Sequence, residues 1–296
     1  MATTQQALNW TVVGQGAIGL LAACRWQQAN TPVRLWLRQP KSLSVRFLAL
    51  DHTEQQCHFQ AAVSPIHALF LPVKAYAVTE ALTQLQPHLT DNAQIVVSHN
   101  GMPDLAVLRQ FARAKQGIWF LTTSHGALRQ TEQIRHTGQG KSMLSPLNEA
   151  ASAHRKAVFT ALNQALGPLT VTENSIAALW QKLAINAAIN PLTAVLNCKN
   201  GALAATEHQP QLQQIVSEVC QLASLEQVDL PFTATFAQVQ QVITATANNY
   251  SSMQQDYYHG RPTELSVITG FIVATAAKHQ LAVPANQALW QALQDT

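Results

Sequence analysis

The chain has 296 residues, of which 47% are hydrophobic and 11% are charged, and its formal net charge is +3. This length provides a substantial core and suits one large domain or two ordinary ones. The basic residues are scattered and form no stripe, which argues against a nucleic-acid-binding protein. No run approaches the roughly 20 apolar residues of a membrane span, and the first ten residues lack the features of a signal peptide. We therefore expect a cytoplasmic protein with no nucleic-acid or membrane partner.

The four cysteines give no sign of a metal site. Cys24, Cys57, Cys198 and Cys220 form no C-x-x-C pair and no close spacing with histidine. This pattern predicts neither a zinc site nor a redox dithiol. We expect buried thiols in a reducing compartment, and no metal.

The first half of the chain alternates between strand-like and helix-like segments. Apolar runs predict strands at 10–14, 32–38, 66–73 and 93–101. Helical periodicity predicts helices at 17–29, 75–89 and 103–114. Such alternation with short connections indicates an α/β domain of the Rossmann type, with a parallel sheet covered on both faces.

The pattern changes near Gly117. Short β-like runs follow at 117–128, 133–140 and 141–145, and we expect them to extend the sheet with antiparallel strands. A helix is predicted at 148–166, and beyond Glu173 helical periodicity marks 174–197, 209–227, 233–249 and 264–280. The sequence thus predicts two domains, an α/β domain over residues 1–170 and an all-helical domain over residues 171–296.

A glycine pattern separates the first strand from the first helix. Gly14, Gly16 and Gly19 form G-x-G-x-x-G in this position. Gly14 would permit a tight turn, Gly16 the approach of a pyrophosphate, and Gly19 close packing of helix and strand. Free N–H groups at the helix start would bind phosphate, whereas a glycine turn without a ligand is the alternative. The predicted cofactor-binding residues of this turn are Gly14, Gln15, Gly16, Ala17, Ile18 and Gly19.

The end of the second strand indicates which nicotinamide cofactor binds. NAD-preferring folds usually place an acid there to accept from the ribose 2′-hydroxyl. This strand instead ends in WLRQPKS, with Arg38 and no acid. Arg38 can pair with a 2′-phosphate, and Lys41 or Lys74 could add a second positive charge. The missing carboxylate favours NADPH over NADH; the alternative is that Arg38 is only a solvated strand-end cation.

Asn100 ends the strand that begins at residue 93. Ligands of open α/β sheets bind outside the carboxyl ends of strands. Asn100 is therefore placed to contact the nicotinamide or the substrate. The Asn-Gly pair is also a common turn, and spacing alone leaves both interpretations open.

An apolar helix near residue 180 carries three polar residues at steps of four. Lys182, Asn186 and Asn190 share one side of this helix because it turns about 100° per residue. Burial of all three without partners would be costly, so the side faces either water or a polar cleft between the domains. Pro191 removes a backbone donor and predicts a kink beside the stripe.

The later segment 248–273 begins with an unusually polar and aromatic stretch. HGRPTE then breaks the periodicity, and we expect a helix to resume with Glu264 near its first turn. The helix dipole favours a carboxylate there, which is the simplest explanation of Glu264.

These segments together resemble the ketopantoate reductase (2-dehydropantoate 2-reductase) family over nearly the whole chain. The resemblance is carried by GQGAIG, WLR, LPVKAY, HNGM, WQKLAINAAINPLTAVLNCKNG and SSMQQDYYHGRPTELSVITG. The last three segments in this order are far more specific than a dinucleotide fingerprint. The resemblance implies reduction of ketopantoate to (R)-pantoate with NADPH, on the route to pantothenate and coenzyme A.

The resemblance also implies roles for individual residues. Lys182 matches the catalytic lysine, and Glu264 matches a glutamate near the lysine, the substrate and the cofactor. Asn100 matches the asparagine where nicotinamide and substrate meet. The positions matching substrate-binding residues are Asn186, Asn190, Asn200, Asn249 and Ser252. Arg38 and Lys74 match the partners of the 2′-phosphate, but Ala77 stands where some members have a glutamine, so the cofactor could depend more on Arg38.

This chemistry suits the residues. Negative charge develops on the ketone oxygen as hydride arrives, and an ammonium can stabilise it and deliver a proton. Lys182 is therefore the predicted general acid. We expect the protein to be a monomer or a homodimer. Two alternatives remain: a related NADP-dependent 2-oxo acid reductase or 3-hydroxy acid dehydrogenase, and an NADPH-binding sensor without turnover.

Overall fold

The computed structural model describes residues 8–294, which pack as two compact units. The first unit comprises residues 8–99 and 104–175, and the second comprises 100–103 and 176–294. The short segment Asn100–Pro103 therefore packs with the second unit although its neighbours on both sides belong to the first.

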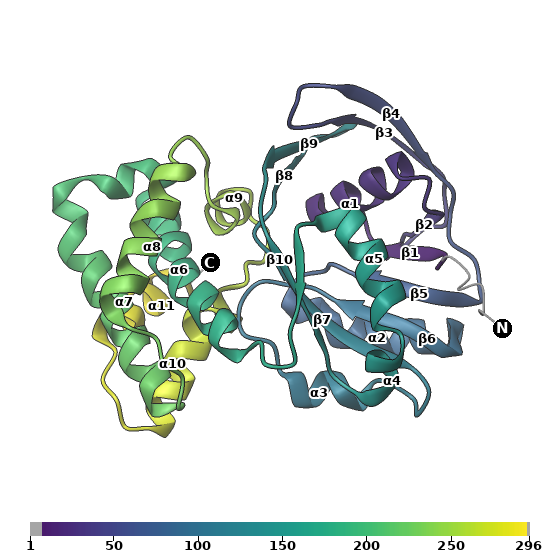
Figure 1. Cartoon of the computed structure of the whole chain (residues 1–296). Coiled ribbons are helices and arrows are strands. Elements are labelled where there is room, and N and C mark those ends of the chain that lie inside the picture. The colour runs from purple at the N-terminus through teal and green to yellow at the C-terminus, as the bar shows by residue number, and fades with distance from the viewer. Residues whose placement is uncertain (1–7, 295–296) are drawn as a thin grey trace. The chain divides into compact units, whose positions relative to one another are not determined.

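The first unit is built on a seven-stranded sheet (Figure 1). Its strands are β1 (Trp10–Val13), β2 (Val33–Trp36), β5 (Ile66–Leu71), β6 (Leu89–Val97), β7 (Gly117–Thr123), β10 (Ser142–Pro146) and β11 (Leu169–Val171). The spatial order is β11-β10-β7-β6-β5-β1-β2, and every pair is parallel except β7–β10. The predicted parallel sheet with an antiparallel extension is thus confirmed.

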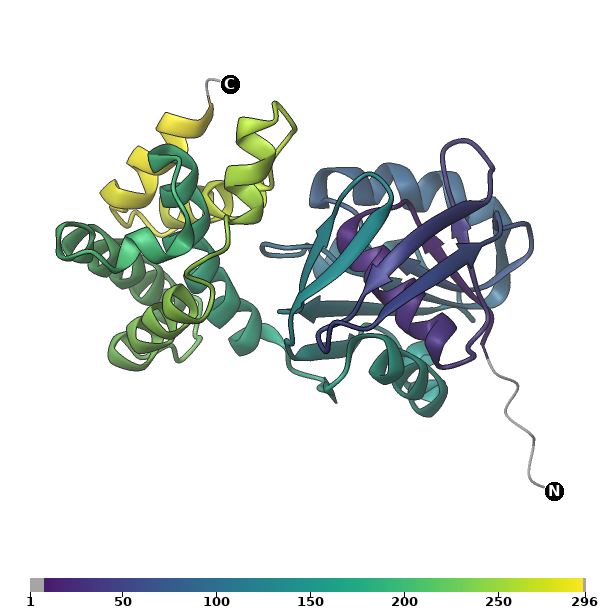
Figure 2. The same ribbon diagram turned by 90° about the horizontal axis from the view of Figure 1, so that it is seen from above.

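A second, four-stranded sheet was not predicted. It consists of β3 (Leu43–Leu48), β4 (Glu54–Phe59), β8 (Gly126–Arg129) and β9 (Gln133–Gly138), in the order β4-β3-β9-β8. We expected the segments around 126–138 to extend the main sheet, and this prediction was wrong. They pair with the β3–β4 hairpin because β9 lies parallel to β3, and the resulting sheet arches over α1 (Figure 2).

The core of the first unit surrounds α1. The helices are α1 (Ala17–Gln28), α2 (Val78–Leu85), α3 (Leu105–Gln110), α4 (Glu149–Ala153) and α5 (Arg155–Leu166). Helix α1 packs against β1 on one side and against β8 and β9 on the other. Trp26 of α1 stacks on Trp10 with ring centroids 4.8 Å apart, and its indole N–H donates to the Ala161 carbonyl at 2.7 Å. Because α1 is covered on both sides, its sequence is apolar nearly all round.

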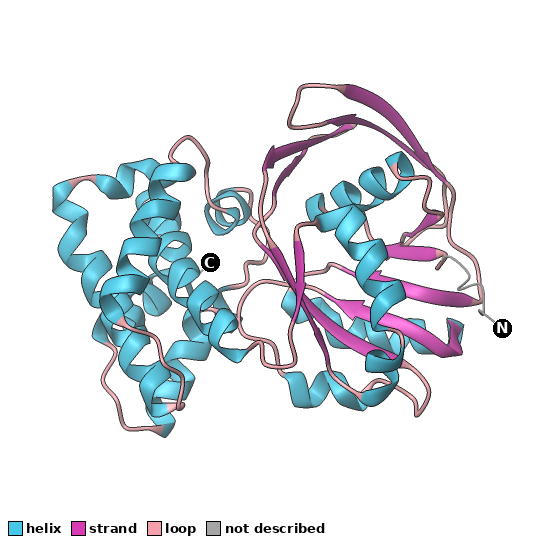
Figure 3. Cartoon of the chain, viewed as in Figure 1, coloured by secondary structure: helices cyan, strands magenta, loops and turns pink. Residues whose placement is uncertain are grey.

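The second unit is all-helical, as predicted (Figure 3). Its α-helices are α6 (Ile176–Leu196), α7 (Gln209–Leu225), α8 (Phe232–Ala245), α9 (Ser252–Tyr258), α10 (Thr269–Lys278) and α11 (Pro284–Gln294). Helix α6 contacts α7, α8, α9 and α11, so it forms the centre of this unit. The periodicity did not predict α9 and α11. Among the described residues, no helix is both long and apolar enough to cross a membrane.

Candidate active site

The first unit brings the predicted phosphate-binding positions to one edge of its sheet. Strand β1 lies between β2 and β5, so the strand order reverses at β1. Open α/β sheets bind ligands outside the carboxyl ends of the strands at such a point. Gly14 follows β1, Arg38 follows β2 and Lys74 follows β5. Because these strands are parallel, the three residues lie beyond the same edge.

The glycine turn has the geometry that its sequence predicts. Gly14 has φ +78°, a conformation that favours glycine, and its N–H donates to the Trp36 carbonyl at 2.8 Å. A Cβ on Gly19 would lie 2.9 Å from Pro72 Cγ and 3.1 Å from Val12 Cγ1, so α1 packs close to the sheet. Gly16 is the N-cap residue of α1, and no side chain caps the N–H groups there. The first N–H groups of the helix are thus suited to phosphate oxygens.

The two predicted partners of the 2′-phosphate differ in exposure. Arg38 is exposed two residues beyond β2. Lys74 is half-buried and precedes the 3-10 turn η1 (Ala75–Ala77). An exposed guanidinium at this edge is accessible to a phosphate and can bind it through charge-assisted hydrogen bonds.

In the second unit, α6 carries the polar stripe. Lys182, Asn186 and Asn190 are each partly exposed, whereas their neighbours Leu183 and Ala187 are buried. The side of the helix that carries the stripe is therefore partly accessible from Lys182 to Asn190. The helix runs unbroken through Pro191.

Lys182 lies within the electrostatic influence of Glu264, which is 5% exposed and directly precedes the 3-10 turn η5 (Leu265–Val267). Burial lowers the pKa of Lys182 to about 8, and the negative charge of Glu264 opposes that change. A lysine with such a pKa can both hold and release a proton near neutral pH. The sequence had placed Glu264 near the first turn of a helix, but α10 begins only at Thr269.

Asn100 fixes the orientation of Glu264. The backbone N–H of Asn100 donates to Oε1 at 3.2 Å, and its side-chain amide donates to Oε2 at 3.0 Å. A backbone hydrogen bond also ties this segment to η5, because the N–H of Met102 donates to the Val267 carbonyl at 2.9 Å. These contacts belong to the second unit, in which Asn100–Pro103 packs.

The remaining predicted substrate-binding residues follow α6 and α8. Asn249 and Ser252 are exposed, on the loop before α9 and at its first residue. Asn200 is buried: its backbone N–H donates to the Asn249 carbonyl at 2.9 Å, and its amide donates to Thr246 Oγ1 at 2.9 Å. The contacts of Asn200 thus hold the loop that presents Asn249.

Sequence reasoning missed a hydroxyl pair that joins this loop to α6. The Oγ atoms of Thr193 and Ser251 lie 2.7 Å apart, and both residues are buried. Ser251 also caps α9 by accepting from the N–H of Gln254 at 3.0 Å. The S-x-x-Q spacing of Ser251 and Gln254 is typical of a helix start, and could have revealed the cap. The Gln254 amide in turn donates to Asn197 Oδ1 at 2.9 Å.

Comparison with known proteins agrees with this arrangement. Residues 10–149 match the family model "Ketopantoate reductase PanE/ApbA", and residues 174–296 match "Ketopantoate reductase PanE/ApbA C terminal". A 2-dehydropantoate 2-reductase of Vibrio cholerae is 40% identical over 289 residues, which cover 96% of each chain.

Solved structures share the fold. A D-mandelate dehydrogenase in a ternary structure with NADH and anilino(oxo)acetate aligns with a TM-score of 0.85 at 19% identity, covering 97% of both chains. A dimeric ketopantoate reductase from Staphylococcus aureus aligns with a TM-score of 0.80 at 18% identity, covering 97% of this chain and 98% of that one. The family models span most of both units, and the chain therefore belongs to the ketopantoate reductase (PanE/ApbA) family.

Proposed function

We propose that this protein reduces ketopantoate to (R)-pantoate with NADPH. One observation carries the proposal. Asn100 holds the buried Glu264 by two hydrogen bonds, and the negative charge of Glu264 acts on Lys182, whose pKa is lowered to about 8. The 40% identity with the Vibrio cholerae 2-dehydropantoate 2-reductase supports the choice of substrate.

In this proposal the first unit binds the cofactor. The N–H groups at the start of α1 would bind the pyrophosphate, with Gly14, Gln15, Gly16, Ala17, Ile18 and Gly19 forming the turn. Arg38 and Lys74 would neutralise the 2′-phosphate. Bound NADPH supplies the hydride.

The second unit would bind the keto acid and supply the proton. Lys182 donates its proton to the ketone oxygen as negative charge develops there. Glu264 would keep Lys182 protonated, and Asn100, which holds Glu264 in place, would contact the nicotinamide or the substrate. The residues that would orient the substrate are Asn186, Asn190, Asn249 and Ser252, with Asn200 supporting the loop.

The proposal includes the cellular compartment and the oligomeric state of the enzyme. The four cysteines are free, which suits a reducing cytoplasm. The assembly is a monomer or a homodimer, and the dimeric Staphylococcus aureus relative favours the homodimer.

The test is a substrate panel with NADPH oxidation as the readout. Ketopantoate should give a higher kcat/KM than pyruvate, 2-oxobutyrate and 2-oxoisovalerate. If 2-oxoisovalerate, which has a hydrogen in place of the hydroxymethyl group of ketopantoate, is reduced as efficiently as ketopantoate, the substrate assignment is wrong. Tight NADPH binding without oxidation by any 2-oxo acid would indicate a sensor.

A further inference from the structure

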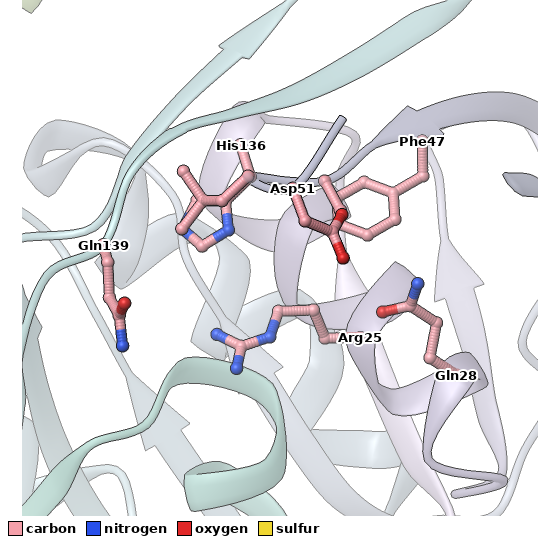
Figure 4. Close-up of a pocket in the computed structure, with 8 residues that line it drawn as sticks. Arg25, Gln28, Phe47, Asp51, His136 and Gln139 are labelled. Carbon is pink, nitrogen blue, oxygen red and sulfur yellow. The ribbon is translucent and has the colours of Figure 1, made fainter. Parts of the chain in front are cut away.

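A cavity of about 250 Å³ lies in the first unit, away from the glycine turn. Its lining residues come from the last turn of α1, the β3–β4 hairpin and β9 (Figure 4). Arg25 is nine residues beyond Gly16, which places it roughly 14 Å along α1 from the turn at 1.5 Å per residue. The cavity is therefore a separate feature from the proposed cofactor edge.

Arg25 contributes an unpartnered charged group to this cavity. Its Nη1 atom is buried and has no hydrogen-bond partner in the described part of the chain. Burial lowers the pKa of the guanidinium, yet arginine keeps its charge in proteins. Leaving a buried charged donor unpaired is unfavourable. Arg25 as a whole is only half-buried and lines the cavity, so a ligand there could supply an acceptor to the guanidinium.

The neighbouring polar groups are already engaged elsewhere. His136 is neutral at physiological pH because burial, with the charges of His125 and Arg25, lowers its pKa to about 4. Its Nε2 lies 3.1 Å from Nδ1 of His125. Asp51 accepts from the backbone N–H of Thr53 at 3.0 Å and from its hydroxyl at 2.7 Å. His136 therefore carries no charge, and Asp51 forms no ion pair with Arg25 among the described residues, although its carboxylate places a negative charge in the lining of the cavity.

Two amides line the same cavity as Arg25. Figure 4 shows Arg25 between Gln28 and Gln139, with its guanidinium directed towards the Gln139 side and beneath His136. Primary amides can donate to an oxyanion, and an arginine fork can grip two of its oxygens at once. Phe47 and Leu50 add an apolar wall beside these donors.

We propose that this cavity binds a small oxyanion, a carboxylate or a phosphate group, through Arg25. The amide of Gln139, on the side to which the guanidinium is directed, adds a further donor, and the apolar wall accommodates a short carbon chain. This site goes beyond the proposed reduction and does not depend on it.

Calorimetric titration of the full chain tests the site, with inorganic phosphate and butyrate as separate probes at constant ionic strength. Each titration is run with and without NADPH, because NADPH would block phosphate from the glycine turn. The variants are Arg25→Gln and, as a matched control, Arg129→Gln, which removes an exposed arginine of the second sheet. At least one probe should bind Arg25→Gln on the order of 10- to 100-fold more weakly than wild type, the effect of losing a charge-assisted contact.

Thermal unfolding distinguishes a ligand site from a structural role. Because Arg25→Gln removes a half-buried charge whose Nη1 atom has no partner, its Tm should equal or exceed that of the wild type. Arg25→Lys, which keeps the charge without the fork, should bind the probe with intermediate affinity. The probe that binds more tightly identifies the anion. The proposal is overturned if the wild type binds neither probe, or if Arg25→Gln and Arg129→Gln bind both probes equally well.

Discussion

Asn100 and Glu264 are 164 residues apart in sequence, yet two hydrogen bonds of 3.2 and 3.0 Å join them. Both carboxylate oxygens accept from Asn100, one from the backbone and one from the amide. This pairing fixes the plane of the carboxylate, and it keeps a negative charge buried in the unit that contains Lys182. The charge in turn opposes the loss of the Lys182 proton.

Glu264→Gln should shift the pH dependence of the reaction. Removing the negative charge removes the contribution that raises the pKa of Lys182, so this pKa should fall below about 8. Because protonated Lys182 is the proposed acid, kcat/KM for ketopantoate should then decline at a lower pH. We expect the alkaline break to move down by on the order of one pH unit. Glu207→Gln, at an exposed position of the same unit, is the control; a break that stays in place or moves up would exclude the role.

Arg38→Gln should weaken the binding of NADPH but not that of NADH. Losing one charge-assisted contact to the 2′-phosphate should raise KM for NADPH by roughly 10- to 100-fold. KM for NADH should change little, because NADH has no 2′-phosphate. Arg34→Gln is the matched control, since Arg34 is exposed on β2 itself. Equal changes in KM for NADPH and NADH would show that Arg38 does not bind the 2′-phosphate.

Thr193→Val should loosen the loop that presents Asn249 and Ser252. Valine keeps the shape of threonine but leaves Ser251 without the hydroxyl that now lies 2.7 Å away. We expect a loss of roughly 1–3 kcal/mol in the free energy of unfolding, together with a higher KM for ketopantoate. KM for NADPH should not change. Urea unfolding and steady-state kinetics measure these effects.

The control for this change is Thr244→Val. Thr244 lies exposed on α8, where its hydroxyl donates to the Gln240 carbonyl at 3.0 Å. It should have little effect on stability or on either KM. If Thr193→Val alters both KM values alike, its effect is a general loss of packing and not a loosening of this loop.

Local patterns were sufficient to predict part of this structure. The strand, glycine turn and first helix around Gly14 were predictable because the sequence signals for all three lie within residues 10–29. The β3–β4 hairpin shows how a usable signal was missed. Leu43, Val45 and Phe47 alternate with polar residues, and Val45 and Phe47 are buried, which is the period of a strand with one buried face.

Long-range pairings could not be read from the sequence. Nothing near β3 indicates that β9 will lie beside it, about ninety residues later. Likewise, the resemblance marked Asn100 and Glu264 as site residues, but it gave no sign that they bond to each other. Such pairings depend on how segments distant in sequence pack together, and local periodicity does not predict which segments will meet.

The central claim is that Lys182 donates the proton in ketopantoate reduction, and its most direct test is kcat at saturating NADPH and ketopantoate. Lys182→Ala should lower kcat by on the order of 10²-fold or more, the scale of a positioned general acid. Lys278→Ala, which removes an exposed lysine of the same unit, should leave kcat unchanged. A Lys182→Ala enzyme with a kcat within about threefold of the wild type, far less than a general acid contributes, would contradict the account.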